Sequence, residues 1–154
     1  AEVFVNPTSE VGSPLLTTKD IARRARATEN LAYVVSANSA RMDGTAVPAS
    51  STTGMTKIVD YRGEVLAEAA AGGESMVATA MIDLDALRAT RRRTGLTNQL
   101  VRQPFQAYAG SYARTVFHPK NLLLKDGEAR VPGKGESTAW QSADIGRLSD
   151  AGII

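Results

Sequence analysis

The chain contains no cysteine and only one histidine among its 154 residues. Without cysteine it can form no disulfide, no thiolate–metal site and no thiol nucleophile of its own. One histidine is too few for the usual zinc or di-iron ligand sets. We therefore expect no metal and no organic cofactor.

Aromatic residues, excess charge and long apolar runs are also scarce. Aromatics make up 5% of the residues, and 18 basic against 16 acidic side chains leave a net charge of +2. Nucleic-acid binding usually needs a basic surface and aromatic side chains that stack on bases. No apolar run approaches the roughly 18 residues that a membrane span needs. We expect no nucleic-acid partner, no membrane association and a cytoplasmic location.

The content of 43% hydrophobic and 22% charged residues is typical of a folded globular domain, and the length suits one such domain. The chain opens directly on an apolar strand, "AEVFVN", without a methionine. Whole proteins rarely begin in this way. We therefore expect that part of the protein lies upstream of Ala1.

Hydrophobic periodicity predicts an α/β layered domain. Asp83 is the expected N-cap of its second helix, which has acid at its start and base at its end, as the helix dipole favours. The helices should cover one face of the sheet and leave an apolar face that needs a cover. The expected elements are a strand at 2–5, a helix at 18–30, a strand at 31–38, a β-hairpin within 55–69, a strand at 75–83 and a helix at 84–95.

Three arginines, at 91–93, end the second predicted helix. They could form an anion site, but a solvated helix end is the more common use of such a cluster. Beyond residue 96 the periodicity fades, with a short helical turn expected within 98–108. The last part, 116–154, has isolated apolar residues between glycines and prolines. It is predicted to be an extended tail that packs on another surface, its own or that of a partner.

The joint between the first helix and the following strand carries a carboxylate and an amide, Glu29 and Asn30. If buried, these groups must be hydrogen-bonded. They could tie down loop backbone, which we favour, or support an active-site loop from behind. Ser9 and Glu10 could suggest a nucleophile or an acid, but no base accompanies them. The motifs contain no complete catalytic constellation.

Several segments, taken in order, resemble one known family. They are "NPTSE" after the first strand, "RARATENLAYVVSAN" at the helix–strand joint, "GMTKIVDYRGEVLAEA" over the hairpin and "GGESMVATAMIDLDALRATRRRTG". This order is similar to the C-terminal half of a nitrilase-superfamily carbon–nitrogen hydrolase. The resemblance covers about residues 1–100. We accordingly expect part of a hydrolase domain at 1–115 and the tail at 116–154.

The resemblance implies half of a four-layer α-β-β-α sandwich, completed by an N-terminal half. It also implies a homodimer or higher oligomer, with the helix 18–30 at the subunit interface and the tail crossing to a partner. The family uses a Glu–Lys–Cys triad in which the thiolate attacks the substrate carbon. All three residues would lie upstream of Ala1, so this chain alone is expected to be inactive.

The resemblance also nominates residues of this chain. Asn6, Thr8 and Ser9 would line the substrate pocket, and the loop 42–53 is a weaker candidate for its rim. Glu29, Asn30 and Asn38 match positions that support the structure. The implied substrate is a small amide, N-carbamoyl or nitrile compound, and "NPTSE" resembles amidases and carbamoylases more than nitrilases.

Two other readings stay open from the residues. The chain could be a non-catalytic assembly or regulatory module derived from this fold. It could also be an unrelated α/β binding domain, which a different strand pairing or layer order would indicate. An upstream cysteine about 20 residues before Ala1, preceded by lysine and glutamate, would favour the enzyme.

Overall fold

The computed structural model describes residues 1–10, 18–46, 48, 52, 54–72, 74–114 and 122–152. Its contacts divide the chain into two compact units, Ala1–Gln103 and Pro104–Ile154. Each unit is described by itself.

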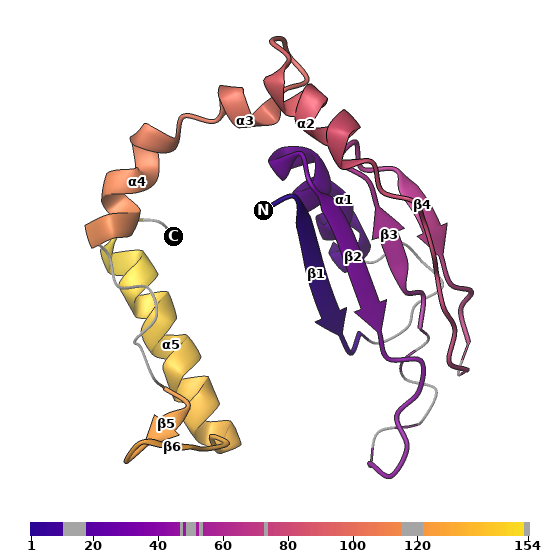
Figure 1. Ribbon diagram of the computed structural model, residues 1–154. Helices are drawn as coiled ribbons and strands as arrows, with labels where there is room; N and C mark the ends of the chain where they lie inside the picture. Colours follow the sequence, from indigo (N-terminus) through magenta and orange to yellow (C-terminus); the bar gives the residue numbers. More distant parts are fainter. Residues whose placement is uncertain are drawn as a thin grey trace. The chain divides into compact units, whose positions relative to one another are not determined.

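The first unit is built on a four-stranded sheet in the order β1-β2-β3-β4 (Figure 1). Strand β1 runs parallel to β2, whereas β3 is antiparallel to both β2 and β4. The parallel pair is joined by the helix α1, as a crossover requires. This arrangement confirms the expected strand–helix–strand unit followed by a hairpin. The bounds are β1 Val3–Thr8, α1 Thr18–Asn30, β2 Tyr33–Asn38, β3 Lys57–Val59 and β4 Val65–Glu68.

Side chains pack on both faces of this sheet. Under α1, Ala27 of the helix packs with valines of β2, β3 and β4. On the opposite face, the ring of Tyr33 meets that of Tyr61 edge to face at a centroid distance of 5.6 Å. The side chain of Leu87, fully buried, completes this second cluster from the helix α2, Leu84–Arg92. Alternation along β2 therefore divides the core into two parts.

The end of α1 is a Schellman motif. The amide of Ala32 donates to the carbonyl of Ala27 at 3.0 Å, and the amide of Leu31 donates to the carbonyl of Thr28 at 3.3 Å. Leu31 has a φ of 41°, the left-handed conformation that this motif requires and that glycine usually supplies. The motif turns the chain directly from the helix into β2.

The remaining carbonyls at this joint are bound by side chains from later in the sequence. Gln103 donates to the carbonyl of Glu29 at 3.0 Å. Arg91 donates to the carbonyls of Asn30 at 3.2 Å and Leu31 at 2.8 Å, and to that of Ala1 at 2.6 Å. Of the three arginines expected at a solvated helix end, only Arg92 and Arg93 are exposed. The expectation was thus wrong for Arg91, because the bonds that hold it connect residues 60, 61 and 90 positions apart, beyond the reach of a local pattern.

Helix α2 begins as expected at Asp83. The Asp83 carboxylate accepts from the amide of Ala86 at 2.8 Å, and Tyr33 exchanges hydrogen bonds with the backbone of Asp83. The short helix α3, Gln99–Arg102, confirms the expected turn of helix in this region. Tyr33 thereby attaches the start of α2 to strand β2 by specific polar contacts.

Gly63 ends the tight turn between β3 and β4. Its φ is 85°, and a Cβ there would lie 2.8 Å from the hydroxyl oxygen of Thr28 on α1. The carboxylate of Asp60 accepts from the amides of Arg62 and Glu64, which fixes the turn. Glycine is therefore required both by the backbone conformation and by the close approach of the helix.

The strand expected at 75–83 is not formed. The described residues of this stretch pair with no strand of the structure, and Val77 and Met81 are 89% and 91% exposed. Only Ile82 packs against the core. The apolar composition of the segment 75–83 indicated a strand, but a strand also needs a neighbouring strand with free backbone groups.

In the described part of the second unit, residues 104–114 and 122–152, there are two helices and a two-stranded hairpin. Their bounds are α4 Phe105–Arg114, β5 Leu124–Lys125, β6 Glu128–Ala129 and α5 Lys134–Asp150. Arg130 forms a bidentate ion pair with Glu136 and lies 5.3 Å from the ring centre of Trp140. The tail that was expected to be extended is instead an α-helix over 134–150. The sequence did not indicate this helix because Gly135 and Gly146 interrupt the helical pattern, and because no residue of α5 is buried, so the hydrophobic periodicity is weak.

None of the described helices is long and apolar enough to cross a membrane.

We expect Arg91→Met to lower the free energy of unfolding by about 2 kcal/mol, because three carbonyl oxygens lose a charged donor. Arg92→Met is the matched control, since Arg92 is exposed. Equilibrium urea denaturation measures both. Equal stability of the two variants would contradict the role of Arg91.

Stability should also depend on pH through Glu2. The hydrogen bond from Arg88, at 2.8 Å, is the main reason why the pKa of Glu2 lies below its ordinary value of 4.5. In the unfolded chain Glu2 takes up its proton at higher pH, so this contribution is present above pH 4.5 and is lost as the pH falls through the lower folded value.

Urea denaturation of the wild type and of Glu2→Gln, measured at several values between pH 3 and pH 7, tests this dependence. The stability difference between the two proteins should be largest at neutral pH and should close in acid. A difference that does not vary with pH would rule out the Glu2 contribution.

Candidate functional site

The carboxyl ends of the parallel strands β1 and β2 form an open concavity. It has a volume of about 540 Å³ and is lined by Pro7, Thr8 and Ser9 from one strand end and by Ala37, Asn38 and Ser39 from the other. The parallel register pairs Thr8 with Asn38, so both strands end at the same level. Ligands of α/β proteins commonly bind at this edge of the sheet.

Asn38 is the centre of the hydrogen bonds at this edge. Its side-chain oxygen accepts from the Thr8 hydroxyl at 3.1 Å and from the Glu10 amide at 2.7 Å. Its Nδ2 donates to the carbonyls of Glu10 at 3.3 Å and Gly54 at 2.8 Å. Its backbone amide donates to the hydroxyl of Thr56 at 3.2 Å. One amide side chain therefore joins the segment after β1, the end of β2 and the chain entering β3.

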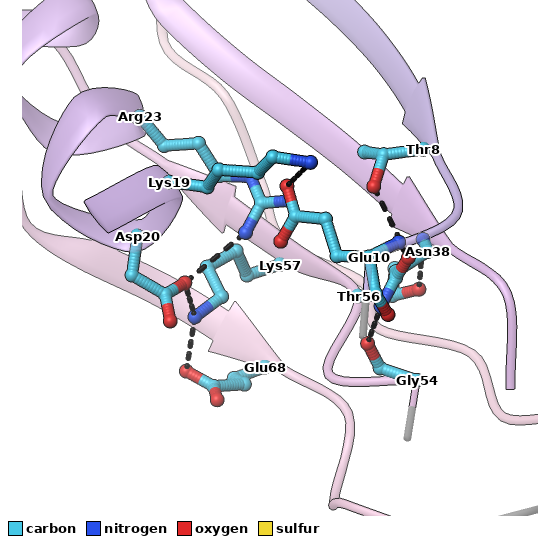
Figure 2. A network of polar contacts seen from close by, with 10 residues as sticks. All are labelled: Thr8, Glu10, Lys19, Asp20, Arg23, Asn38, Gly54, Thr56, Lys57 and Glu68. Carbon is cyan, nitrogen blue, oxygen red and sulfur yellow. Dashed lines mark hydrogen bonds and ion pairs between the residues drawn. The ribbon is translucent and has the colours of Figure 1, made fainter. Parts of the chain in front are cut away.

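A chain of ion pairs lies next to this site, beneath α1 (Figure 2). Glu10 pairs with Arg23 at 2.5 Å, and Arg23 pairs with Asp20 at 3.1 Å. Asp20 also pairs with Lys57 at 2.5 Å, and Lys57 lies 3.4 Å from Glu68. Asp20, Arg23 and Lys57 are buried. Buried charges are tolerated only when they are paired, and here each has a partner of opposite sign.

The structure divides the predicted pocket residues between two cavities. Ser9 lines the concavity at the strand ends, whereas Asn6 lines a groove of about 420 Å³ between β1 and α1. Thr8 borders both. The division follows from strand geometry, because side chains at positions of equal parity share a face. The sequence motif did not distinguish the two.

The other predicted residues lie as follows. Asn38 is part of the site itself. The Glu29 side chain is exposed, and the Asn30 amide donates to the Arg26 carbonyl in its own helix at 2.9 Å. Arg91 of α2 and Gln103 bind the backbone carbonyls of Asn30 and Glu29, not their side chains. The supporting role of the Glu29 and Asn30 side chains therefore stays a prediction. In the loop 42–53, positions 47, 49–51 and 53 lie outside the described residues.

Sequence reasoning missed Asp20, Arg23 and Lys57. The spacing of Asp20 and Arg23 is that of an ion pair on one helix face, which was an available signal. The alternation of Lys57 with its neighbours in β3 predicted the face of the strand on which it lies, but it did not indicate which residue would pair with it. Its partner Asp20 is 37 positions away. Only the packing of α1 on the sheet brings these charges together.

The chemistry of this site is that of binding and positioning. Its hydroxyl and amide groups can hydrogen-bond a polar ligand, while the buried charges neutralise one another. Among the described residues, no group of three or more histidine, cysteine or acidic side chains could hold a metal ion. The cysteine-free sequence supplies no thiol nucleophile to this edge.

Asn38→Asp should lower the free energy of unfolding by about 2 kcal/mol, because the carbonyls of Glu10 and Gly54 would lose their donor and face a carboxylate. Ser39→Ala, at the same rim, is the control and should be nearly neutral. Urea denaturation at neutral pH gives both values. Indistinguishable midpoints would show that Asn38 does not organise this edge.

Comparison with known proteins places these features in a family. The model of the carbon–nitrogen hydrolase family matches residues 1–92. Among solved structures, Saccharomyces cerevisiae Nit3, a member of branch 10 of the nitrilase superfamily, is 25% identical at a TM-score of 0.51, covering 65% of this chain and 35% of that one. A carbon–nitrogen hydrolase from Helicobacter pylori G27 is 19% identical at a TM-score of 0.56, covering 75% of this chain and 42% of that one.

No curated protein gives a significant match. The chain spans less than half the length of either solved structure. The mixed α/β arrangement of the first unit matches these nitrilase-fold structures and is consistent with the α-β-β-α sandwich. Since the family match covers more than half of the 154 residues, the chain belongs to the carbon–nitrogen hydrolase family.

Proposed function

We propose that this chain is the C-terminal part of a hydrolase of non-peptide C–N bonds in amides, N-carbamoyl compounds or nitriles. The observation that carries the proposal is the family match over residues 1–92. Within this class, the motif "NPTSE" favours an amidase or carbamoylase over a nitrilase. The Glu–Lys–Cys triad would be supplied by residues upstream of Ala1.

In this mechanism a cysteine thiolate attacks the carbonyl or nitrile carbon, and a glutamate transfers the protons. A lysine stabilises the negative charge that develops on the attacked group. This chain contributes the wall of the pocket. Thr8 and Ser9 would hydrogen-bond the substrate at the carboxyl ends of β1 and β2, with Asn6 next to them.

The face of the sheet opposite α1 would receive the second sheet of the sandwich. Along this face the register aligns Val5, Val35, Ile58 and Ala67 in one apolar row. Val5 is 71% exposed at the open edge of the sheet. Stacked sheets bury such rows at a separation of about 10 Å. Because Ile58 in this row is already buried, it is the exposed end of the row at Val5 that supports an N-terminal half as the partner.

The helix α1 would meet its counterpart in a homodimer or higher oligomer. Ile21, 52% exposed, lies beside the small side chains of Ala25 and Thr28 in a shallow depression next to Gly63. Small residues allow two helices to approach closely. The hydrolase domain is proposed to extend to about residue 115, with 116–154 contributing to assembly.

The first test is an intact-mass and peptide-map analysis of the natural polypeptide that carries this chain, treated with iodoacetamide. Peptides upstream of Ala1 with an alkylated cysteine, together with loss of ammonia release from amides, N-carbamoyl compounds or nitriles, would support the hydrolase. If the natural polypeptide has only the 16.3 kDa mass of this chain and hydrolyses none of these compounds, the result would instead favour the non-catalytic assembly module.

In the active polypeptide, Ser9→Ala should raise KM about fivefold with little change in kcat, because one substrate hydrogen bond is lost equally from ground and transition states. Ser142→Ala, exposed on α5, is the control. Steady-state kinetics on the best substrate measures both. Unchanged KM in Ser9→Ala would remove this serine from the pocket.

A further inference from the structure

Glu10, the residue that follows the two proposed pocket hydroxyls, is held on three sides. Its amide donates to the Asn38 side chain at 2.7 Å, and its carbonyl accepts from the same side chain at 3.3 Å. Its carboxylate accepts from Arg23 at 2.5 Å, and Lys19 lies 3.9 Å from the same oxygen. A loop residue just beyond a strand end is usually held by few hydrogen bonds, so the number of contacts at Glu10 requires a reason.

The restraint is anchored in the interior. The side chain of Arg23 is only 6% exposed, and it binds Asp20 as well as Glu10. Asp20 is held in turn by Lys57 of β3, whose side chain is equally buried. A buried guanidinium between two carboxylates has little freedom to move. The carboxylate of Glu10 is therefore fixed to the packed face of α1 and not to another loop.

The Glu10 carboxylate points away from the concavity at the strand ends. Glu10 lines the groove between β1 and α1, together with Arg23 and Lys19, and is absent from the residues that line the concavity. Figure 2 shows its carboxylate directed toward Arg23 and Lys19 while its backbone lies against Asn38. This geometry does not suit an acid or base that acts on a ligand in the concavity.

We infer that Glu10 is a positioning residue, which through Arg23 and Asn38 holds Thr8 and Ser9 at the wall of the pocket. The inference rests on the proposed function for its consequence in catalysis. Apart from the Glu10 carboxylate, the segment 8–10 is attached to β2 by exposed or half-buried contacts. The Asn38 side chain binds the Thr8 hydroxyl and the Glu10 backbone, the Ser39 amide donates to the Thr8 carbonyl at 3.1 Å, and the Ser9 and Ser39 hydroxyls lie 3.2 Å apart. Releasing the Glu10 carboxylate leaves these contacts to hold the segment.

The test uses the natural polypeptide that carries this chain, with three variants. Glu10→Ala removes the carboxylate, and Glu10→Gln keeps an acceptor oxygen for Arg23. Glu64→Ala is the matched control, because Glu64 is an exposed glutamate of the same unit. Two readouts are required: hydrogen exchange of the backbone amides of Glu10 and Ser39, and steady-state kinetics.

In Glu10→Ala, the amide of Ser39 and that of residue 10 should exchange about tenfold faster, since their acceptors lie in or against the released segment. KM should rise about tenfold while kcat changes less than twofold, because the hydroxyls contact the substrate and not the reacting atoms. Glu10→Gln should recover most of both effects, and Glu64→Ala should match the wild type.

Unchanged exchange in Glu10→Ala would overturn the inference, whether or not the protein is active. Faster exchange with unchanged KM would also overturn it, because the segment would then be mobile without consequence for binding. A loss of kcat alone that Glu10→Gln does not recover would indicate an acid–base role in place of positioning. Absence of any hydrolysis by the wild type would instead overturn the proposed function, while the exchange data would still decide whether Glu10 holds the segment.

Discussion

Three charged side chains, Asp20, Arg23 and Lys57, are buried where α1 meets the sheet, and their need for partners constrains the first unit. Removing a charge from water costs several kcal/mol unless a counter-charge replaces the lost hydration, as a rough estimate. Asp20 meets this need for both cations at once. The helix therefore cannot rotate or slide on the sheet without leaving a charge unpaired. The hydrophobic contacts of Ala27 supply attraction, whereas the charges define one position.

That position determines the edge of the sheet at which the candidate site lies. Arg23 reaches Glu10 only because α1 lies in this place, and Glu10 is bound to the end of β2 by Asn38. The parallel register then brings Thr8 and Asn38 to the same level. The other end of α1 is equally defined, since Leu31 turns the chain and Arg91 binds the carbonyls that the helix leaves open. Both ends of the crossover are thus held by polar contacts to distant parts of the chain.

The family gives this arrangement a context. The match over residues 1–92 ends at the last residue of α2, so the sheet, α1 and the site all lie inside it. The chain spans 35% and 42% of the two solved structures described above. Under the function proposed above, this chain supplies one wall of the pocket, which fits a site that has hydroxyls and amides but no thiol.

Local signals in the sequence determined most elements of the first unit. The helix at 18–30, the strands around it, the hairpin and the Asp83 cap all depend on residues within a few positions of one another, and the segment order was sufficient to indicate the family. The strand expected at 75–83 did not form, because a strand depends on a neighbour as well as on composition. Helix α5 was missed because it has no buried face to produce a periodic pattern. The ion pairs of Arg23 with Glu10 and of Lys57 with Asp20, and the use of Arg91 at the helix end, were decided only by tertiary structure, since each depends on groups that folding brings together from separate parts of the chain.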